Sequence, residues 1–394
     1  MPHVIYVARS IPSDIGHGGQ HRAYQVLHDL ERTVGSRRVT VISWRQWRQS
    51  QPVQAPHPNR LIRVAARIRR RLALCLENPY KLLANTFFTI GYFSTPGFLE
   101  DYERIVRDTP SPAVCIIDDV RFAGLLPINS RHGISTISCI QNLESLDNSA
   151  LDHKQKWGIY TTATDFANEF RVLAQCVERL FISKVETALT SGLGLSARYY
   201  PYLPVGAIRQ CLEIIRQKRS RANIEPGLFL MLGSAVHLTT RESFAWFVRN
   251  VKSHGLPDGV RLIVGGEQTD RLLAPGSSVP GLELRGWLEQ DELDRLLLQA
   301  QAVLAPQRHG FGALTRLPEL SCAGVPVIAS RHSTYAIDPT PGLVAVEDDW
   351  GAWYAKMAEF AKNRICAPLG DYNDWEATQP RTLQEVLKRM LTEF

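Results

Sequence analysis

The sequence has 394 residues, of which 44% are hydrophobic and 21% charged, and its formal net charge is +6. This length exceeds one ordinary domain and suits two α/β domains of similar size. The composition excludes a largely disordered chain, and the mild positive charge suits an anionic substrate or membrane surface without requiring nucleic acid. The seven cysteines include no CxxC pair, which favours a reducing cytoplasm over a disulfide framework or a structural zinc site.

The first apolar run, residues 4–7, is too short for a signal peptide and follows no basic region. No segment approaches the roughly 20 apolar residues of a transmembrane helix. We therefore expect a cytoplasmic protein, at most peripheral on the inner face of the membrane.

The first half alternates apolar runs with glycine loops and helical patterns. Residues 4–7 predict a strand, a loop with Gly16, Gly18 and Gly19 follows, and the apolar spacing of residues 20–30 predicts a helix. Further strands are predicted over residues 38–43, 113–117 and 134–140, and a helix over 166–176. This order is typical of a Rossmann-like unit. Residues 199–206, rich in proline and aromatic residues, are interpreted as the interdomain connection.

Residues 60–71 combine six arginines with apolar residues and predict a basic amphipathic helix, from Arg60 to Arg71. Such a helix could rest on anionic lipid near a lipid-linked acceptor, bind an acidic glycan, or simply be solvated. No known nucleic-acid-binding module is present, so we expect no nucleic-acid partner.

The second half repeats the β-loop-α alternation more clearly. Strands are predicted over residues 228–232, 261–264, 282–284, 302–305 and 325–330, and helices over 241–252, 291–300, around Glu319 and over 382–394. This alternation predicts a parallel sheet with helices on both faces. We expect an N-terminal domain over residues 1–205, a C-terminal domain over 206–375, and a terminal helix within 376–394 that packs back on the body.

Glycine and serine follow several strands of the second half, at the sheet edge where open parallel sheets bind ligands. Gly233-Ser234 and Gly310-Phe311-Gly312 would let backbone amides approach a phosphate. Arg316 could reach a diphosphate there, and Glu319, one helical turn further, suits the two hydroxyls of a ribose. The alternative is a surface ion pair between Arg316 and Glu319.

Several runs in this half resemble the donor domain of glycosyltransferase family 4. They are Gly233-Ser234, residues 245–247 (AWF), 262–265 (LIVG), 280–287 (PGLELRGW) and 319–330 (ELSCAGVPVIAS). Their order and spacing match over roughly a hundred residues. The Gly18-Gly19 loop, with Arg22 one turn further on, is also similar to that family.

The resemblance implies a GT-B fold, in which two Rossmann-like doubly wound parallel-sheet domains face a central cleft. It implies a retaining enzyme that uses a nucleotide-sugar as substrate and needs no metal or other cofactor, with a glycan or lipid-linked acceptor in polysaccharide synthesis. Glu319 would bind the ribose, Arg316 would contact the diphosphate, and Gly19 would lie near the donor phosphates. Asp118-Asp119 is a weak metal candidate, because two acids at a strand end are more often solvated or capping.

The sequence departs from the family 4 pattern at two positions that would lie near the reacting sugar. His309 precedes the Gly310-Phe311-Gly312 loop where relatives carry a glutamate, so it either touches the donor sugar or caps the loop. Gln141 stands where relatives often place a histidine; its amide can hydrogen-bond a sugar hydroxyl but cannot act as an acid or base. Other candidates near the cleft are His17, His237 and Glu144.

Two rival functions remain open. The missing glutamate and histidine suit a catalytically weak GT-B protein that binds a nucleotide or glycan as a partner subunit. A GT-B epimerase acting on a nucleotide-sugar without an acceptor is a third reading.

Overall fold

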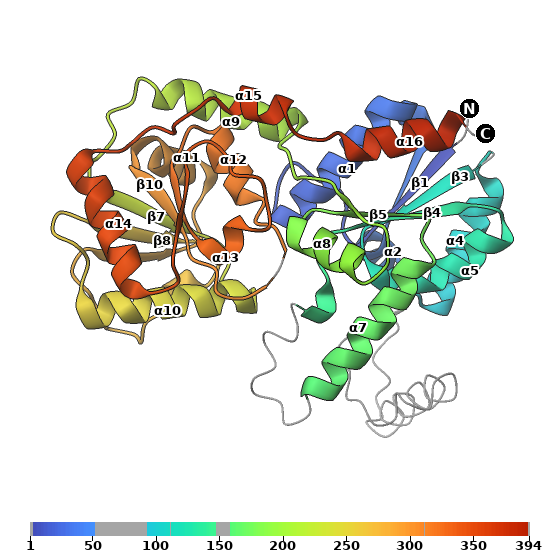
Figure 1. The fold of residues 1–394 in the computed structure, drawn as a ribbon, viewed down its shortest axis with the longest axis horizontal. Helices are drawn as coiled ribbons and strands as arrows, with labels where there is room; N and C mark the ends of the chain where they lie inside the picture. Colours follow the sequence, from blue (N-terminus) through green and yellow to red (C-terminus); the bar gives the residue numbers. More distant parts are fainter. Residues whose placement is uncertain (1–2, 52–92, 111, 147–157, 311, 393–394) are drawn as a thin grey trace.

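The computed structural model describes residues 3–51, 93–110, 112–146, 158–310 and 312–392. The basic stretch from Arg60 to Arg71 and the loop residue Phe311 lie outside the described residues. The described chain forms two lobes, each built on one six-stranded parallel sheet (Figure 1).

The N-terminal sheet has the strand order β2-β1-β3-β4-β5-β6. Its strands are β1 (His3–Ala8), β2 (Val39–Ser43), β3 (Pro112–Ile117), β4 (Ser135–Ile140), β5 (Glu178–Phe181) and β6 (Arg198–Tyr199). The helices of this lobe are α1 (Gly18–Val34), α2 (Trp44–Ser50), α4 (Pro96–Asp108), η3 (Val120–Leu125), α5 (Leu126–Arg131), α7 (Gly158–Ala174) and α8 (Lys184–Gly192). Apolar side chains fill both faces: Phe98, Phe122 and Leu173 belong to one cluster, and Val26 belongs to the other.

The C-terminal sheet has the order β12-β11-β10-β7-β8-β9. Its strands are β7 (Leu228–Leu232), β8 (Arg261–Gly265), β9 (Leu282–Gly286), β10 (Ala302–Ala305), β11 (Val327–Ser330) and β12 (Leu343–Val346). The helices are α9 (Gly206–Arg219), α10 (Leu238–His254), α11 (Gln290–Gln299), α12 (Arg316–Cys322), α13 (Arg331–Thr334), α14 (Trp350–Asn363) and α15 (Tyr372–Ala377). One core cluster contains Ile215 of α9 and Leu296 of α11, and the other contains Phe247 of α10 and Trp353 of α14.

The last helix, α16 (Thr382–Thr392), crosses back from the C-terminal lobe and lies beside α1 (Figure 1). Its apolar face, which includes Leu383, Val386 and Leu387, enters the core cluster that contains Val26 of α1. The Gln384 amide also donates a hydrogen bond to Asp29 Oδ1 at 3.0 Å. The predicted end of the C-terminal domain, between residues 375 and 376, falls inside α15. The domain limits given in the sequence analysis stay predictions.

The strands predicted from apolar runs are present, with shifts at their ends. Helix α1 begins at Gly18 rather than at residue 20, because His17 and Gln20 form a reciprocal cap around its first turn. Strand β11 begins at Val327 rather than at residue 325, because the Val325 amide still bonds to Leu320 in the turn after α12. Among the described helices, none is long and apolar enough to cross a membrane.

Candidate functional site

Loops at the carboxyl ends of the two sheets meet between the lobes. A Cβ atom on Gly18, after β1, would lie 2.2 Å from Thr315 Oγ1, which precedes α12. A Cβ on Gly312 would lie 3.2 Å from the Cβ of Asn142, after β4. These two positions need small residues because the lobes approach each other there. The glycine loops predicted from opposite halves of the sequence are therefore adjacent.

Glu319 lies in the first turn of α12 at this junction. Its Oε1 accepts a hydrogen bond from Tyr202 Oη at 2.7 Å and lies 2.8 Å from His21 Nδ1. The Glu319 and His21 side chains are each 17% exposed. Among the described residues Glu319 makes no ion pair with Arg316, so the alternative of a surface pair between them is wrong. Glu319 instead links α12 to α1 and to the connection between the lobes.

The Arg316 guanidinium is turned toward the end of β7. Its Nη1 donates a hydrogen bond to the Leu232 carbonyl at 2.7 Å, and burial lowers the Arg316 pKa to about 10 while Glu319 opposes that shift. A Cβ on Gly233 would lie 2.7 Å from the same Nη1. The absence of a side chain at Gly233 thus leaves space for the Arg316 guanidinium. Arg316 stabilises the end of β7 through its hydrogen bond to the Leu232 carbonyl.

The amide of Gly233, expected to approach a phosphate, is already bonded, and so is the amide of Gly19, which is expected near the donor phosphates. The Gly233 N–H donates to the Gly265 carbonyl at 3.0 Å, and the Gly19 N–H donates to His17 Nδ1 at 3.2 Å. Both amides have acceptors because Gly233 continues the β7–β8 pairing and His17 caps α1, and the approach of these loops to a phosphate stays a prediction. Ser234 Oγ likewise accepts from the Val236 N–H at 3.3 Å and stabilises its own loop.

The first turn of helix α10 has backbone amides that could bind an anion. His237 is its N-cap residue and makes no side-chain hydrogen bond to the first turn. The first amides of a helix have no acceptor within the helix, and the helix dipole favours an anion there. The His237 ring also lies edge-on to His17 across the lobe junction, with 6.0 Å between centroids. Burial and the charge of His237 lower the pKa of His17, which suits its role as an acceptor for Gly19.

The loop before α12 is fixed by its own neighbours. Gly310 has a φ of +91°, which favours glycine, and its carbonyl accepts from His332 Nε2 at 2.5 Å. The His309 carbonyl accepts from Gln307 Nε2 at 3.0 Å, and its ring Nε2 lies 4.0 Å from Glu242 Oε2 of α10. The ring of His309 therefore lies on the α10 side of this loop.

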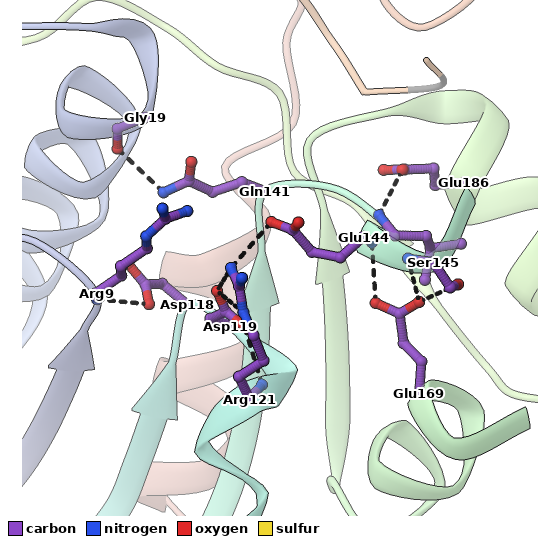
Figure 2. Close-up of polar contacts among 11 residues, drawn as sticks. Arg9, Gly19, Asp118, Asp119, Arg121, Gln141, Glu144, Ser145, Glu169 and Glu186 are labelled. Atoms are coloured by element: carbon purple, nitrogen blue, oxygen red, sulfur yellow. Dashed lines mark hydrogen bonds and ion pairs between the residues drawn. The ribbon is translucent and has the colours of Figure 1, made fainter. Parts of the chain in front are cut away.

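Gln141, at the end of β4, donates from Nε2 to the Gly19 carbonyl at 3.1 Å (Figure 2). It lines a small cavity with Arg9, Asp118, Asp119 and Glu144. The two loops that carry Gln141 and Gly19 are thus tied together on the N-terminal side of the junction.

Acidic residues surround Gln141 in Figure 2. The Arg9 N–H donates to both oxygens of Asp118, at 3.0 and 3.2 Å, and burial followed by the charge of Asp119 raises the Asp118 pKa to about 8. Asp119 caps η3 and pairs with Arg121, which also reaches Glu144 at 3.2 Å. Within the described residues no group of three or more potential ligands is arranged to hold a metal.

Two further glutamates hold the loop that follows Gln141. Glu169 of α7 accepts from the Glu144 and Ser145 amides at 3.1 and 3.2 Å, and Glu186 of α8 accepts from the Leu143 amide at 2.7 Å (Figure 2). Burial raises the pKa of Glu169 to about 8. The position of residues 141–145 is therefore set by carboxylates from two helices.

Sequence reasoning missed several residues at the junction: Arg9, His21, Arg121 and Tyr202. His21 follows Gly18 by three residues and so shares its helix face, which is a signal that could have found it. Arg22, expected to accompany the glycine loop, is buried and donates to the Tyr200 carbonyl at 2.8 Å and the Pro201 carbonyl at 3.1 Å. Its role is to tie α1 to the connection between the lobes.

Two facing lobes, each a parallel sheet covered by helices, with glycine loops at the junction, define the GT-B fold. The structure is similar over 99% of both chains to HepE of Anabaena, solved with UDP and glucose, at 9% identity and a TM-score of 0.57. It is similar to sucrose-phosphate synthase from Thermosynechococcus elongatus over 99% of both chains, at 13% identity and a TM-score of 0.58. The catalytic domain of starch synthase IV from Arabidopsis thaliana, bound to ADP and acarbose, matches over 100% of this chain and 99% of its own, at 11% identity and a TM-score of 0.56.

No family model and no curated protein sequence matches the chain. At these low identities, the structural likeness establishes the fold.

Proposed function

We propose that this protein is a glycosyltransferase similar to family 4, which takes a sugar from a nucleotide-sugar and passes it, with retention and without a metal, to a glycan or lipid-linked acceptor. The observation that carries the proposal is the position of Glu319. It lies at the lobe junction, opposite the Gly18-Gly19 loop. A carboxylate there suits a ribose, because its oxygens accept hydrogen bonds from adjacent hydroxyls.

The ligands of two chains with this fold support a nucleotide. HepE was solved with UDP and glucose, and starch synthase IV with ADP and acarbose. Both likenesses extend over nearly the whole of this chain, and they support the proposal that a comparable ligand binds at the lobe junction. The linkage, the acceptor and a role in polysaccharide synthesis follow from the resemblance in sequence and belong to this proposal.

Each residue at the junction has a separate role in this proposal. The first-turn amides of α10 meet the diphosphate, and Arg316 adds positive charge behind them while it supports the loop after β7. Glu319 exchanges one of its present partners, His21 or Tyr202, for a ribose hydroxyl. Gln141 hydrogen-bonds a sugar hydroxyl through its amide oxygen and transfers no proton.

The test is a thermal-shift screen with nucleoside diphosphates and their sugar conjugates. A ligand present at about 100 times its Kd stabilises the fold by about 2.7 kcal/mol. We expect one nucleotide class to raise the Tm of the parent, and Glu319→Gln to remove that rise. Arg316→Ala should weaken it too, with each variant compared with its own unliganded Tm because Arg316 also supports Leu232.

Glu225→Gln is the matched control. Glu225 precedes β7, at the opposite end of the sheet, and forms an exposed ion pair with Arg261. This variant should respond to the nucleotide like the parent. If Glu319→Gln and Arg316→Ala also respond like the parent, the nucleotide does not bind where we propose.

A second candidate is a GT-B protein that binds a nucleotide or glycan without turnover. It is favoured by the bonding of Glu319 to His21 and Tyr202 and of Gln141 to Gly19. Release of nucleoside diphosphate from a panel of nucleotide-sugars supports the transferase. Tight binding with no release on any donor supports the second candidate, and conversion of the donor sugar without release supports an epimerase.

One further proposal concerns the N-terminal lobe, where we expect the acceptor to bind. The basic stretch from Arg60 to Arg71 would place the N-terminal lobe on anionic lipid, where a lipid-linked acceptor is found. Co-sedimentation with vesicles containing anionic lipid, compared with neutral vesicles, tests this contact.

A further inference from the structure

Four arginines surround a hollow over the outer face of α10. Arg241 and Arg249 come from α10 itself, Arg271 from η5 (Thr269–Arg271), and Arg308 from the loop after β10. All four are exposed, and the cavity between them measures about 500 Å³. We call this hollow the arginine pocket.

Among the described residues, the lining of the arginine pocket carries more positive than negative charge. In the part of the chain that the structure describes, none of the four guanidinium groups forms an ion pair, and the lining contains one carboxylate, Glu242. Elsewhere in the same lobe arginines are paired: Arg261 and Arg285 share Glu283, at 2.9 and 2.6 Å. Like charges held together without counter-charges repel one another, so an anion bound among them would be stabilised.

One of the four arginines is held in place before any ligand arrives. The Arg308 N–H donates to Ser243 Oγ at 3.1 Å, and its guanidinium lies over the Trp246 ring, 4.8 Å from the centroid. Ser243 Oγ in turn donates to the Thr239 carbonyl at 2.9 Å. A guanidinium stacked on an aromatic ring keeps the N–H groups at its edge free for a carboxylate or phosphate.

The lining is not only cationic. Ala245 and Leu272 add apolar surface between the arginines. Small-molecule pockets have volumes of about 300–1,000 Å³ and combine apolar walls with a few charged groups. A monosaccharide with an acidic substituent matches both features, since its ring can pack on the apolar wall while its charge meets the arginines.

We propose that the arginine pocket binds an anionic sugar, through a carboxylate or phosphate group held by Arg249, Arg271 and Arg308. His309 lines one edge of the pocket, and neither Glu319 nor Gln141 belongs to the lining. The pocket is therefore a second binding surface beside the proposed donor site, and it is tested without nucleotide.

The test is calorimetric titration of the whole protein, without nucleotide and at constant ionic strength. The probes are glucuronate, glucose 6-phosphate, glucose and inorganic phosphate. We expect at least one acidic sugar to bind at least tenfold more tightly than both glucose and inorganic phosphate. Binding of glucuronate identifies a carboxylate ligand, and binding of glucose 6-phosphate identifies a phosphate ligand.

The variant pair decides whether the binding occurs in this pocket. Arg249→Gln combined with Arg271→Gln should weaken the acidic sugar at least tenfold, and both residues are exposed, so the fold should tolerate the change. Arg295→Gln is the control, because Arg295 is an exposed arginine of α11 outside the pocket. Equal binding by the double variant and the parent would overturn the proposal. So would equal affinity for inorganic phosphate and the sugars, or no binding of either acidic sugar.

Discussion

Asp118 shows how a single residue near the lobe junction links protonation to folding. It follows β3 directly, the residue is 5% exposed, and both carboxylate oxygens accept from the Arg9 amide. Its pKa of about 8 lies well above the ordinary value near 3.9. Between these two values the folded protein holds a proton that the unfolded chain has lost. The stability that Asp118 contributes therefore falls as the pH rises through this window.

We predict that Asp118→Asn removes this part of the pH dependence. The free energy of unfolding of the parent should fall by up to about 1.4 kcal/mol per pH unit for each such proton. The variant should show a shallower fall, to which Glu169 still contributes. Urea unfolding at pH 5, 6, 7 and 8 measures the difference. Asp258→Asn, at an exposed aspartate, should keep the parental slope, and a parental slope in Asp118→Asn would contradict the raised pKa.

At the residue scale, the sequence located the glycine loops and Glu319 but not the hydrogen bonds that these residues make. Glycines at strand ends and the placement of Glu319 could be predicted, because local spacing determines them. The His21–Glu319 contact could not, since it joins residues 298 apart and depends on how the lobes face each other. The acceptors of the Gly19 and Gly233 amides could not be predicted for a related reason. A glycine in a loop indicates space, but not whether its own N–H is already used.

At the scale of elements, most strands of both sheets could be predicted from runs rich in β-branched and aliphatic residues. Three strands were not predicted: β5 (Glu178–Phe181), β6 and β12. Strand β6 has two residues, Arg198 and Tyr199, too few for an alternating pattern, and β12 has four at the sheet edge. Both are strands because a neighbouring strand offers backbone hydrogen bonds, which is a property of the assembled sheet.

Helix α16 illustrates an element whose stability depends on a distant partner. Leu387 is fully buried, in the cluster formed by α1 and the N-terminal sheet. We predict that Leu387→Ala lowers the free energy of unfolding by about 2–5 kcal/mol, because it removes a large side chain from a close-packed core.

The neighbouring residue supplies the comparison. Lys388 is exposed on the same helix, so Lys388→Ala should change the free energy of unfolding by no more than about 0.5 kcal/mol. Equal effects of the two substitutions in urea unfolding would show that α16 does not pack as described.

At the scale of the whole molecule, the two lobes touch at several points beyond Glu319. The Lys184 N–H donates to the Ala336 carbonyl at 2.9 Å, and its side chain reaches Asp338 at 2.5 Å. A Cβ atom on Gly18 would lie only 2.2 Å from Thr315 Oγ1 of the other lobe. The spacing of the lobes should therefore depend on the absence of a side chain at residue 18.

We predict that Gly18→Val moves the lobes apart, seen as an increased radius of gyration in small-angle X-ray scattering. Its branched side chain would overlap Thr315 in any rotamer, whereas Gly192→Val, which has open space around it, should leave the radius unchanged. Gly18→Ala in a Thr315→Ala background should keep the parental spacing, because the two Cβ atoms would lie 3.4 Å apart. An unchanged radius of gyration in Gly18→Val would contradict this prediction. It would mean that residues around Thr315 shift to accept the side chain while the lobes keep their spacing.

The return of α16 to α1 also bears on how the protein is made. During synthesis the N-terminal lobe is made before α16, so α1 covers its face of the first sheet alone until residues 382–392 have followed. The apolar side chains that α16 later contacts stay exposed while the second lobe is translated. The nascent first lobe should therefore depend on chaperones during this interval, and docking of α16 should complete its core.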